Sequence, residues 1–217
     1  MKIEVNKSFF ERKCDFLNRR VLYGQFSDRE RDLLYNFIRE LKPKKIVEFS
    51  PAQGYSTSII ASALRDENVP VESFETYEMD EHCACVTEQN LYFQDFEYIK
   101  VIHGDVLETM NLKSIEQCDF LFIDSEHCGE FVRKYVDKFF SHIPQGIYVM
   151  VHDIRVRNGE PCNEESEIIL NYIHDNGITE YFHILDKLRD LNLTDDGTNP
   201  LSGRNELEHS TLFIFKR

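Results

Sequence analysis

The chain has 217 residues, 41% hydrophobic and 29% charged, which is enough to build one domain with a sizeable core. Acidic residues number 39 against 25 basic ones, for a formal net charge of −14. This balance argues against nonspecific nucleic-acid binding, which requires clustered positive charge, although a local basic patch would still allow an RNA substrate. No stretch approaches the roughly 18 consecutive apolar residues of a membrane helix, so no membrane association is expected.

The first ten residues lack the apolar core of a secretion signal, and the six cysteines include no Cys-x-x-Cys pair. The first observation predicts a cytoplasmic protein with reduced thiols. The second argues against a tetrahedral zinc site. No residue pattern indicates an oligomeric state.

The predicted elements begin with an amphipathic helix over Asp28–Leu41, which Ser27 caps and Pro43 ends. Strands and helices then alternate, and the apolar run Phe120–Ile123 is typical of a strand covered on both faces. The alternation predicts an α/β fold with a doubly wound, mostly parallel sheet. Strands are expected at 45–49, 69–75, 99–102, 120–123 and 146–151, and helices around 59–64, 80–91, 126–140 and 164–174.

The pattern changes near the end of the chain. Residues 181–188 and 211–216 are predicted to be two strands that pair antiparallel, with no comparable helix between them. The polar segment 192–210 is predicted to be a long loop. The whole chain, 1–217, is therefore expected to be a single domain. Its parts are an N-terminal helical segment (1–42), an α/β core (43–191), the loop (192–210) and a last strand (211–217).

The turn after the first predicted strand has the composition of a ligand-binding turn. Glu48 lies in the strand, Ser50 follows it, and Gly54 allows a close approach of the backbone to a ligand. Ser56 or Thr57 can cap the helix that follows, whose first N–H groups are free for a ligand. Open α/β sheets bind ligands at this edge.

At these residues the chain resembles the class I S-adenosylmethionine-dependent methyltransferases. Their first motif is an acid, a spacer, a glycine, three variable residues and a second glycine, and here Ser50 replaces the first glycine. Gly54-Tyr55-Ser56-Thr57 is most similar to the subfamily of small-molecule and sugar O-methyltransferases called methyltransferase domain 24. The resemblance covers about residues 23–150. It implies a Rossmann-like sheet of seven strands and S-adenosylmethionine bound by Glu48, Ser50, Gly54, Tyr55, Ser56 and Thr57.

Three further acids occur in the order that the family uses. Glu75, at the end of the second predicted strand, matches the carboxylate that accepts the ribose hydroxyls, with Glu78 as the alternative. Asp105, in His103-Gly104-Asp105, matches the acid near the adenine amino group. Asp124 ends the fourth strand, beside the cofactor's amino acid end or the substrate.

The candidate catalytic residues follow the fourth and fifth strands. The segments 122–127 and 149–153 resemble the subfamily's motifs and supply His127, His152 and Asp153. Transfer of a methyl group to a hydroxyl requires positioning of the acceptor and removal of its proton. A histidine with a pKa near 6.5 suits that task, so His127 or His152 is the predicted base. The predicted acceptor is a hydroxyl of a small molecule, such as a sugar, on the strength of the resemblance.

A second version of the mechanism uses Mg²⁺. Some relatives hold a divalent cation with acids at the ends of strands four and five, where this chain has Asp124 and Asp153. The cation lowers the pKa of a bound hydroxyl. Those relatives add an oxygen ligand after the second acid, where this chain has Ile154. Two carboxylates with water and substrate oxygens still satisfy Mg²⁺.

Other functions of the same fold fit less well. A nicotinamide dehydrogenase needs Gly-x-Gly-x-x-Gly after the first strand, and a nucleotide hydrolase needs Gly-Lys-Ser or Gly-Lys-Thr; this chain has neither there. A protein that binds S-adenosylmethionine, or acts as a scaffold, without catalysis is the alternative that the sequence leaves open.

Overall fold

The computed structural model describes residues 2–11, 26–157, 160–193 and 211–217. Its centre is a seven-stranded sheet in which five neighbouring strands run parallel and the last two pair antiparallel. This arrangement confirms the predicted fold class. In sheet order the strands are β3 (Lys100–His103), β2 (Ser73–Glu78), β1 (Lys45–Phe49), β4 (Phe120–Ile123), β5 (Tyr148–Val151), β9 (Phe213–Lys216) and β8 (Tyr181–His183).

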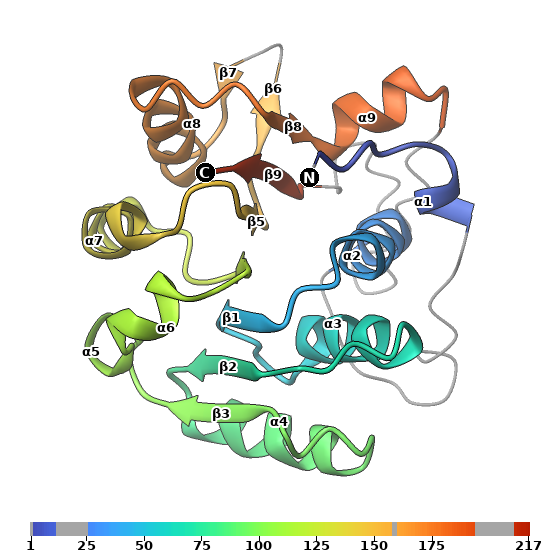
Figure 1. The fold of residues 1–217 in the computed structure, drawn as a ribbon. Helices are drawn as coiled ribbons and strands as arrows, with labels where there is room; N and C mark the ends of the chain where they lie inside the picture. Colours follow the sequence, from blue (N-terminus) through green and yellow to red (C-terminus); the bar gives the residue numbers. More distant parts are fainter. Residues whose placement is uncertain (1, 12–25, 158–159, 194–210) are drawn as a thin grey trace.

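Helices cover both faces of the sheet (Figure 1). The helices on one face are α1 (Ser8–Glu11), α2 (Asp28–Leu41), α3 (Tyr55–Asp66), α4 (Glu81–Tyr92) and α9 (Ile184–Asp190). Those on the other are α5 (Val106–Thr109), α6 (Leu112–Glu116), α7 (Gly129–Phe139) and α8 (Glu164–Asp175). A 3₁₀ turn (Phe140–His142) follows α7, and a small hairpin of β6 (Val156–Arg157) and β7 (Glu160–Pro161) precedes α8.

Two buried apolar clusters, one on each face, hold these layers together. The strand β4 shows why: Phe120 and Phe122 belong to the cluster under α2 and α3, whereas Leu121 and Ile123 belong to the cluster under α7 and α8. Side chains of a strand alternate between faces, so a strand covered on both sides must be apolar throughout. The prediction that residues 120–123 form a strand covered on both faces is therefore confirmed.

The helix α2 begins and ends where the sequence predicted. The Ser27 hydroxyl accepts the Glu30 N–H, and the Glu30 carboxylate accepts the Ser27 N–H, which is a capping box. The carboxylate of Glu30 also accepts the N–H groups of Thr211 and Leu212, the two residues before β9. This buried side chain thus joins the beginning of the domain to its last strand.

Several predicted boundaries were wrong. Strand β2 starts at Ser73 and ends at Glu78 rather than at Glu75. Residues 69–72, predicted to be its beginning, form the connection that leads into it. Residues 184–190 form α9 rather than the second half of a strand, since His183 caps a new helix by accepting the Leu185 N–H. The short elements α5, α6, β6 and β7 were not predicted. The predicted loop 192–210 lies outside the described residues except for 192 and 193.

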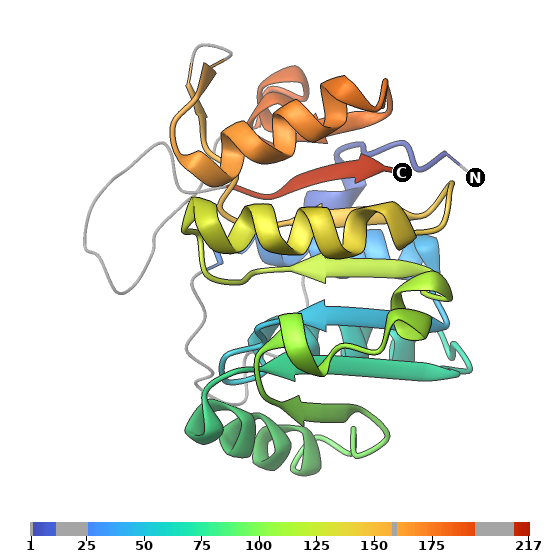
Figure 2. The same cartoon turned by 90° about the vertical axis from the view of Figure 1, so that its left-hand side faces the viewer.

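The carboxyl ends of β1 to β5 meet at one edge of the sheet, the left-hand edge in Figure 2. Ligands of open α/β sheets bind at this edge. Every helix in the described part of the chain is too short or too polar to span a membrane.

Candidate functional site

The turn between β1 and α3 brings its backbone close to neighbouring elements. Ser50, Ala52 and Gly54 all have positive φ angles, of 57°, 51° and 83°. A Cβ on Gly54 would lie 3.1 Å from a methyl carbon of Thr87 on α4, so this position requires glycine on two counts. Gly54 is the N-cap of α3 and supplies no side-chain hydrogen bond, which leaves the start of the helix to interact with a ligand.

The carboxylate of Glu48 is directed into the protein. It is fully buried and accepts the hydroxyls of Ser56 and Thr57, each at 2.6 Å. Burial raises the pKa of Glu48 to about 7, against the effect of these hydrogen bonds. These three side chains bind one another and fix the start of α3 against β1. A direct contact of any of them with a cofactor stays a prediction.

The end of β2 carries Glu78, not Glu75. Both oxygens of Glu78 accept backbone N–H groups, from Ala52 in the first turn and from Asp80 at the start of α4, each at 2.9 Å. Burial raises the pKa of this carboxyl group. Glu75 lies within the strand, accepts the Tyr77 hydroxyl at 2.7 Å and faces Lys100 at 3.5 Å. The strand-end position that was assigned to Glu75 was therefore wrong, and Glu78 occupies it.

Asp105 follows β3, the strand that pairs with β2. Gly104 donates its N–H to the carbonyl of Glu78 at 2.8 Å, which places the two strand ends side by side. The carboxylate of Asp105 accepts the Leu107 N–H at 2.8 Å and caps α5. The first turn, Glu78 and Asp105 thus line one half of the carboxyl edge.

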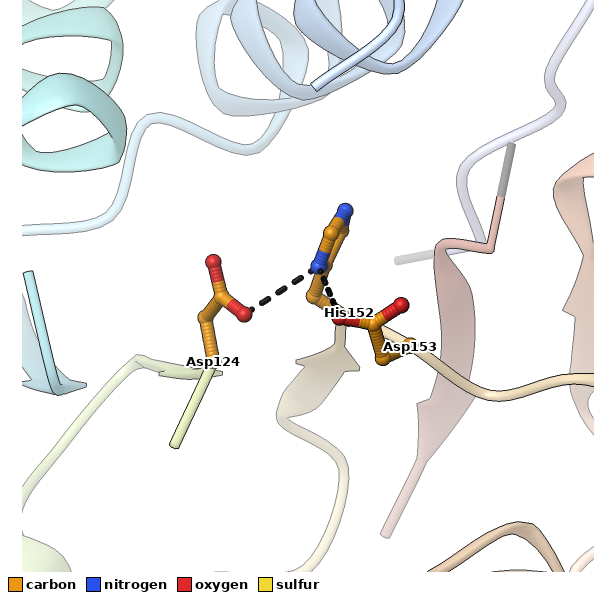
Figure 3. A group of neighbouring side chains, drawn as sticks. All are labelled: Asp124, His152 and Asp153. Atoms are coloured by element: carbon orange, nitrogen blue, oxygen red, sulfur yellow. Dashed lines mark hydrogen bonds and ion pairs between the residues drawn. The ribbon is translucent and has the colours of Figure 1, made fainter. Parts of the chain in front are cut away.

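The other half of the edge holds an acid–histidine cluster, which consists of Asp124 after β4 and His152 and Asp153 after β5 (Figure 3). One nitrogen of His152, Nδ1, lies 3.1 Å from Asp124 Oδ1 and 3.2 Å from Asp153 Oδ2. The other, Nε2, points away from both acids; it is 3.5 Å from Glu30 Oε1 and makes no hydrogen bond to the residues that the structure describes. The side chain of His152 is 3% exposed, and its ring packs on Phe26, with centroids 4.5 Å apart.

His127 joins this cluster from the loop before α7. Its Nε2 lies 3.1 Å from Asp153 Oδ2, and its Nδ1 lies 2.7 Å from Oε2 of Glu165 on α8. The side chain of His127 is 40% exposed, whereas those of Asp153 and Glu165 are 9% and 1% exposed. Of the two histidines, His127 is the one that a molecule from solvent can reach.

Asp153 is the common partner in the cluster. Its backbone has a φ of 61°, and its N–H donates to the Thr211 hydroxyl at 3.1 Å. Its second oxygen lies 3.1 Å from the guanidinium of Arg155. Although burial opposes the effect, hydrogen bonds from His127 and His152 hold the pKa of Asp153 well below its usual range.

Both histidines have raised pKa values. Hydrogen bonds to Asp153 and Glu165 raise the pKa of His127 to about 10. Burial lowers the pKa of His152, but the charges of Asp124 and Glu30 outweigh it and raise the value well above 6.5. Each ring therefore lies against two or more carboxylates that favour its protonated form. The role of His127 or His152 as the base stays a prediction, and these contacts move both rings away from the reference pKa of 6.5 on which it was based.

The sequence did not single out Glu30 and Glu165. Both are buried acids on amphipathic helices. Glu30 stands three residues after Ser27, where a capping box expects an acid. Glu165 is in phase with Ile169 and Ile173 on α8, where the helical spacing expects an apolar residue. An acid on the apolar face of a helix can be recognised in the sequence, whereas the residue that it contacts cannot.

The donor set Asp124, His152 and Asp153 is compatible with a divalent cation. One ligand atom from each residue lies within 4.8 Å of the others. Ile154, where relatives have an oxygen ligand, is fully buried and supplies none from its side chain. The chain therefore offers two carboxylates and one imidazole, and His152 would have to be neutral to act as the third ligand.

Comparison with known proteins finds a methyltransferase family and methyltransferase structures of the same fold. A family described as a methyltransferase domain matches residues 47–154. No curated protein matches the chain. An O-methyltransferase from Bacillus cereus, solved in complex with S-adenosylhomocysteine, has a TM-score of 0.62 at 16% identity over 87% of this chain and 80% of its own.

Two further solved structures share the fold. An S-adenosylmethionine-dependent O-methyltransferase from Thermotoga maritima has a TM-score of 0.58 at 13% identity, over 95% of this chain and 69% of its own. An O-methyltransferase from Streptomyces achromogenes, involved in tomaymycin synthesis and solved with S-adenosylmethionine, has a TM-score of 0.55 at 17% identity, over 72% and 71%.

The buried carboxyl group of Glu48 predicts a pH-dependent stability. Because its folded pKa of about 7 exceeds the unfolded 4.5, its contribution is complete below pH 4.5 and is lost as the pH rises to 7. We expect Glu48→Gln to be more stable than the parent by about 3 kcal/mol at pH 8 and equal to it at pH 4. Urea unfolding at both pH values measures this, with the exposed Glu40→Gln as control. An equal difference at both pH values would contradict the assignment.

Proposed function

The chain belongs to the methyltransferase domain family over residues 47–154 and is an S-adenosylmethionine-dependent methyltransferase, and we propose that its acceptor is a hydroxyl group of a small molecule. The observation that supports this proposal is the carboxyl edge of the sheet. One half carries a turn and acids suited to a nucleoside, and the adjacent half carries acids and histidines suited to proton removal.

The cofactor pocket is proposed to extend from the first turn to Asp124. The backbone of the turn from Ser50 to Tyr55 would face the cofactor's amino acid portion, together with Asp124. Glu78 is proposed to accept the ribose hydroxyls, in place of Glu75, because it ends β2 beside Ala52. Asp105 would lie near the adenine amino group. The bound cofactor supplies an activated methyl group on a sulfonium.

The proposed reaction is an in-line displacement. The acceptor oxygen forms a bond to the methyl carbon while the carbon–sulfur bond breaks, and its electron pair stays on sulfur to give S-adenosylhomocysteine. The hydroxyl proton has to leave the oxygen during transfer or after it. Hydroxyl acceptors fit the names of the O-methyltransferases that share the fold, and a sugar is the class that the sequence resemblance favours.

The proton acceptor is proposed to be His127 rather than His152. His127 is exposed, whereas His152 is enclosed by Phe26, Glu30 and the two aspartates. His127 can take up a proton only when its own Nε2 proton has been released, so we expect the acceptor hydroxyl to displace Asp153 from Nε2 while that proton passes to solvent, to which the ring is exposed. The pKa of the ring would then fall toward the usual value, because the hydrogen bond to Asp153 is the largest cause of its rise.

A divalent cation is the alternative to a histidine base. Asp124 and Asp153 would hold it, with His152 as a third ligand if that ring is neutral. A cation here supplies a lowered pKa for a coordinated acceptor hydroxyl. Nδ1 of His152 already lies 3.1 Å from Asp124 and 3.2 Å from Asp153, so a cation would have to replace these two contacts.

Cofactor binding tests the first half of the proposal. Loss of a charged acceptor of ribose hydrogen bonds costs about 1.5 to 3 kcal/mol, so Glu78→Gln is expected to weaken S-adenosylmethionine binding about tenfold or more. Glu75→Gln is the matched control and should bind as the parent does. Calorimetry with S-adenosylmethionine and S-adenosylhomocysteine measures both. A parent protein that binds neither nucleoside would overturn the proposed function.

Turnover with a panel of hydroxylated metabolites tests the base. We expect His127→Ala to lower kcat about a hundredfold while the affinity for S-adenosylmethionine is retained. His152→Ala is predicted to act mainly on stability, because its removal leaves buried carboxylates without their counter-charge. If both variants turn over like the parent, neither histidine is the base.

Removal of divalent metal separates the two versions of the mechanism. With His127 as the base, activity in the same panel should be unchanged after dialysis against a strong chelator. Loss of activity that returns with Mg²⁺ would instead assign proton removal to a cation held by Asp124 and Asp153. Restored activity with Ca²⁺ as well as Mg²⁺ would indicate a structural cation.

A further inference from the structure

We propose that Glu165 is a positioning residue that fixes the ring of His127 so that Nε2 faces the acceptor. The proposal rests on the proposed function, since it deepens the role of His127. Glu165 lies on α8, outside both predicted sequence motifs, and its two oxygens contact His127 and Tyr135.

The contact between the two side chains is short and enclosed. Oε2 of Glu165 lies 2.7 Å from Nδ1 of His127, and the Glu165 side chain is only 1% exposed. A carboxylate at this nitrogen accepts the Nδ1–H and thereby determines which ring nitrogen is left for other partners. The remaining nitrogen, Nε2, is the one that faces Asp153 at 3.1 Å.

Glu165 is itself held in place. Its other oxygen accepts the hydroxyl of Tyr135 at 3.2 Å, and Tyr135 is fully buried on α7. Burial raises the pKa of Tyr135 well above its ordinary value, so this hydroxyl stays a donor. With both oxygens engaged and almost no exposed surface, the carboxylate cannot turn away from His127.

Stability alone is a poor explanation for an acid at this position. Glu165 is in phase with Ile169 and Ile173, which pack in the apolar cluster under α8, and an apolar side chain would fit that phase. Burying a charged pair gains little over apolar packing because both ions lose their hydration. A carboxylate that is buried against a half-exposed histidine is instead the arrangement that orients a reactive imidazole.

The positions of the elements fit this role. Helix α7 starts directly after the loop that carries His127, and α8 packs beside α7 on the same face of the sheet (Figure 1). Tyr135 on α7 and Glu165 on α8 therefore brace His127 from the helix layer, while Asp153 faces it from the end of β5. The ring is held between the two layers at the edge where the ligands bind.

The test compares Glu165→Gln with Glu165→Asp, Tyr135→Phe and the control Glu167→Gln, whose side chain is exposed on the same helical turn. The first readout is the ¹⁵N spectrum of the histidine rings in the protein with S-adenosylhomocysteine added, assigned with His127→Ala. It requires no acceptor. The second is kcat and KM with an acceptor found in the metabolite panel.

We expect Glu165→Gln to lose the protected Nδ1–H signal of His127 and to lower kcat between about tenfold and a hundredfold, with KM and cofactor affinity unchanged. Glu165→Asp should recover part of kcat. Tyr135→Phe, which removes one hydroxyl and keeps the ring, should produce a smaller loss than Glu165→Gln. Glu167→Gln should match the parent in both readouts.

A retained Nδ1–H signal in a folded Glu165→Gln protein, or an unchanged kcat, overturns the proposal. If Glu165→Gln does not fold, Glu165→Asp and Tyr135→Phe decide by the same two criteria. Failure of the proposed function looks different: the parent protein then fails to bind the nucleosides or to methylate any acceptor, whereas its ring spectrum still reports whether Glu165 holds His127.

Discussion

The parallel alignment of β1 to β5 is the constraint on which the rest of this structure depends. Parallel strands need a crossing connection between them, so their carboxyl ends all lie at one edge and helices cover both faces. β4 is apolar throughout, with Phe122 toward one helix layer and Ile123 toward the other. The acids that could meet a ligand lie at or just after the strand ends, as Glu78, Asp105, Asp124 and Asp153 do. Glu48, inside β1, is instead buried and accepts the hydroxyls of Ser56 and Thr57.

Charge compensation governs the half of the edge that holds the acid–histidine cluster. Carboxylates from four separate elements approach two imidazoles: Asp124, Asp153, Glu30 and Glu165. Buried carboxylates are costly without partners, and their contacts raise the pKa of both rings. In the proposed reaction, Asp153 has to leave Nε2 of His127 before that ring can take up a proton. The proposed chemistry therefore depends on what a bound acceptor does to this one contact.

The other half of the edge uses backbone geometry. Positive φ angles at Ser50, Ala52 and Gly54 bend the chain between β1 and α3, and Glu78 and Thr87 hold this bend through contacts with Ala52. Glu48 fixes the first turn of α3 against β1 by accepting the hydroxyls of Ser56 and Thr57. A ligand would meet a preformed surface here, which lowers the entropic cost of binding.

The sequence by itself determined the alternation of elements, the sheet class, the helix over 28–41 and the cluster residues that follow β4 and β5. These features are local, because periodicity, capping and strand-end acids can be read from neighbouring residues. Tertiary structure decided the rest. It showed that β2 ends at Glu78, that residues 184–190 are helical, and that Glu30 and Glu165 face the histidines. A strand's end is set by its neighbour in the sheet, and the pKa of a buried group by partners distant in the chain, so neither is encoded in a local pattern.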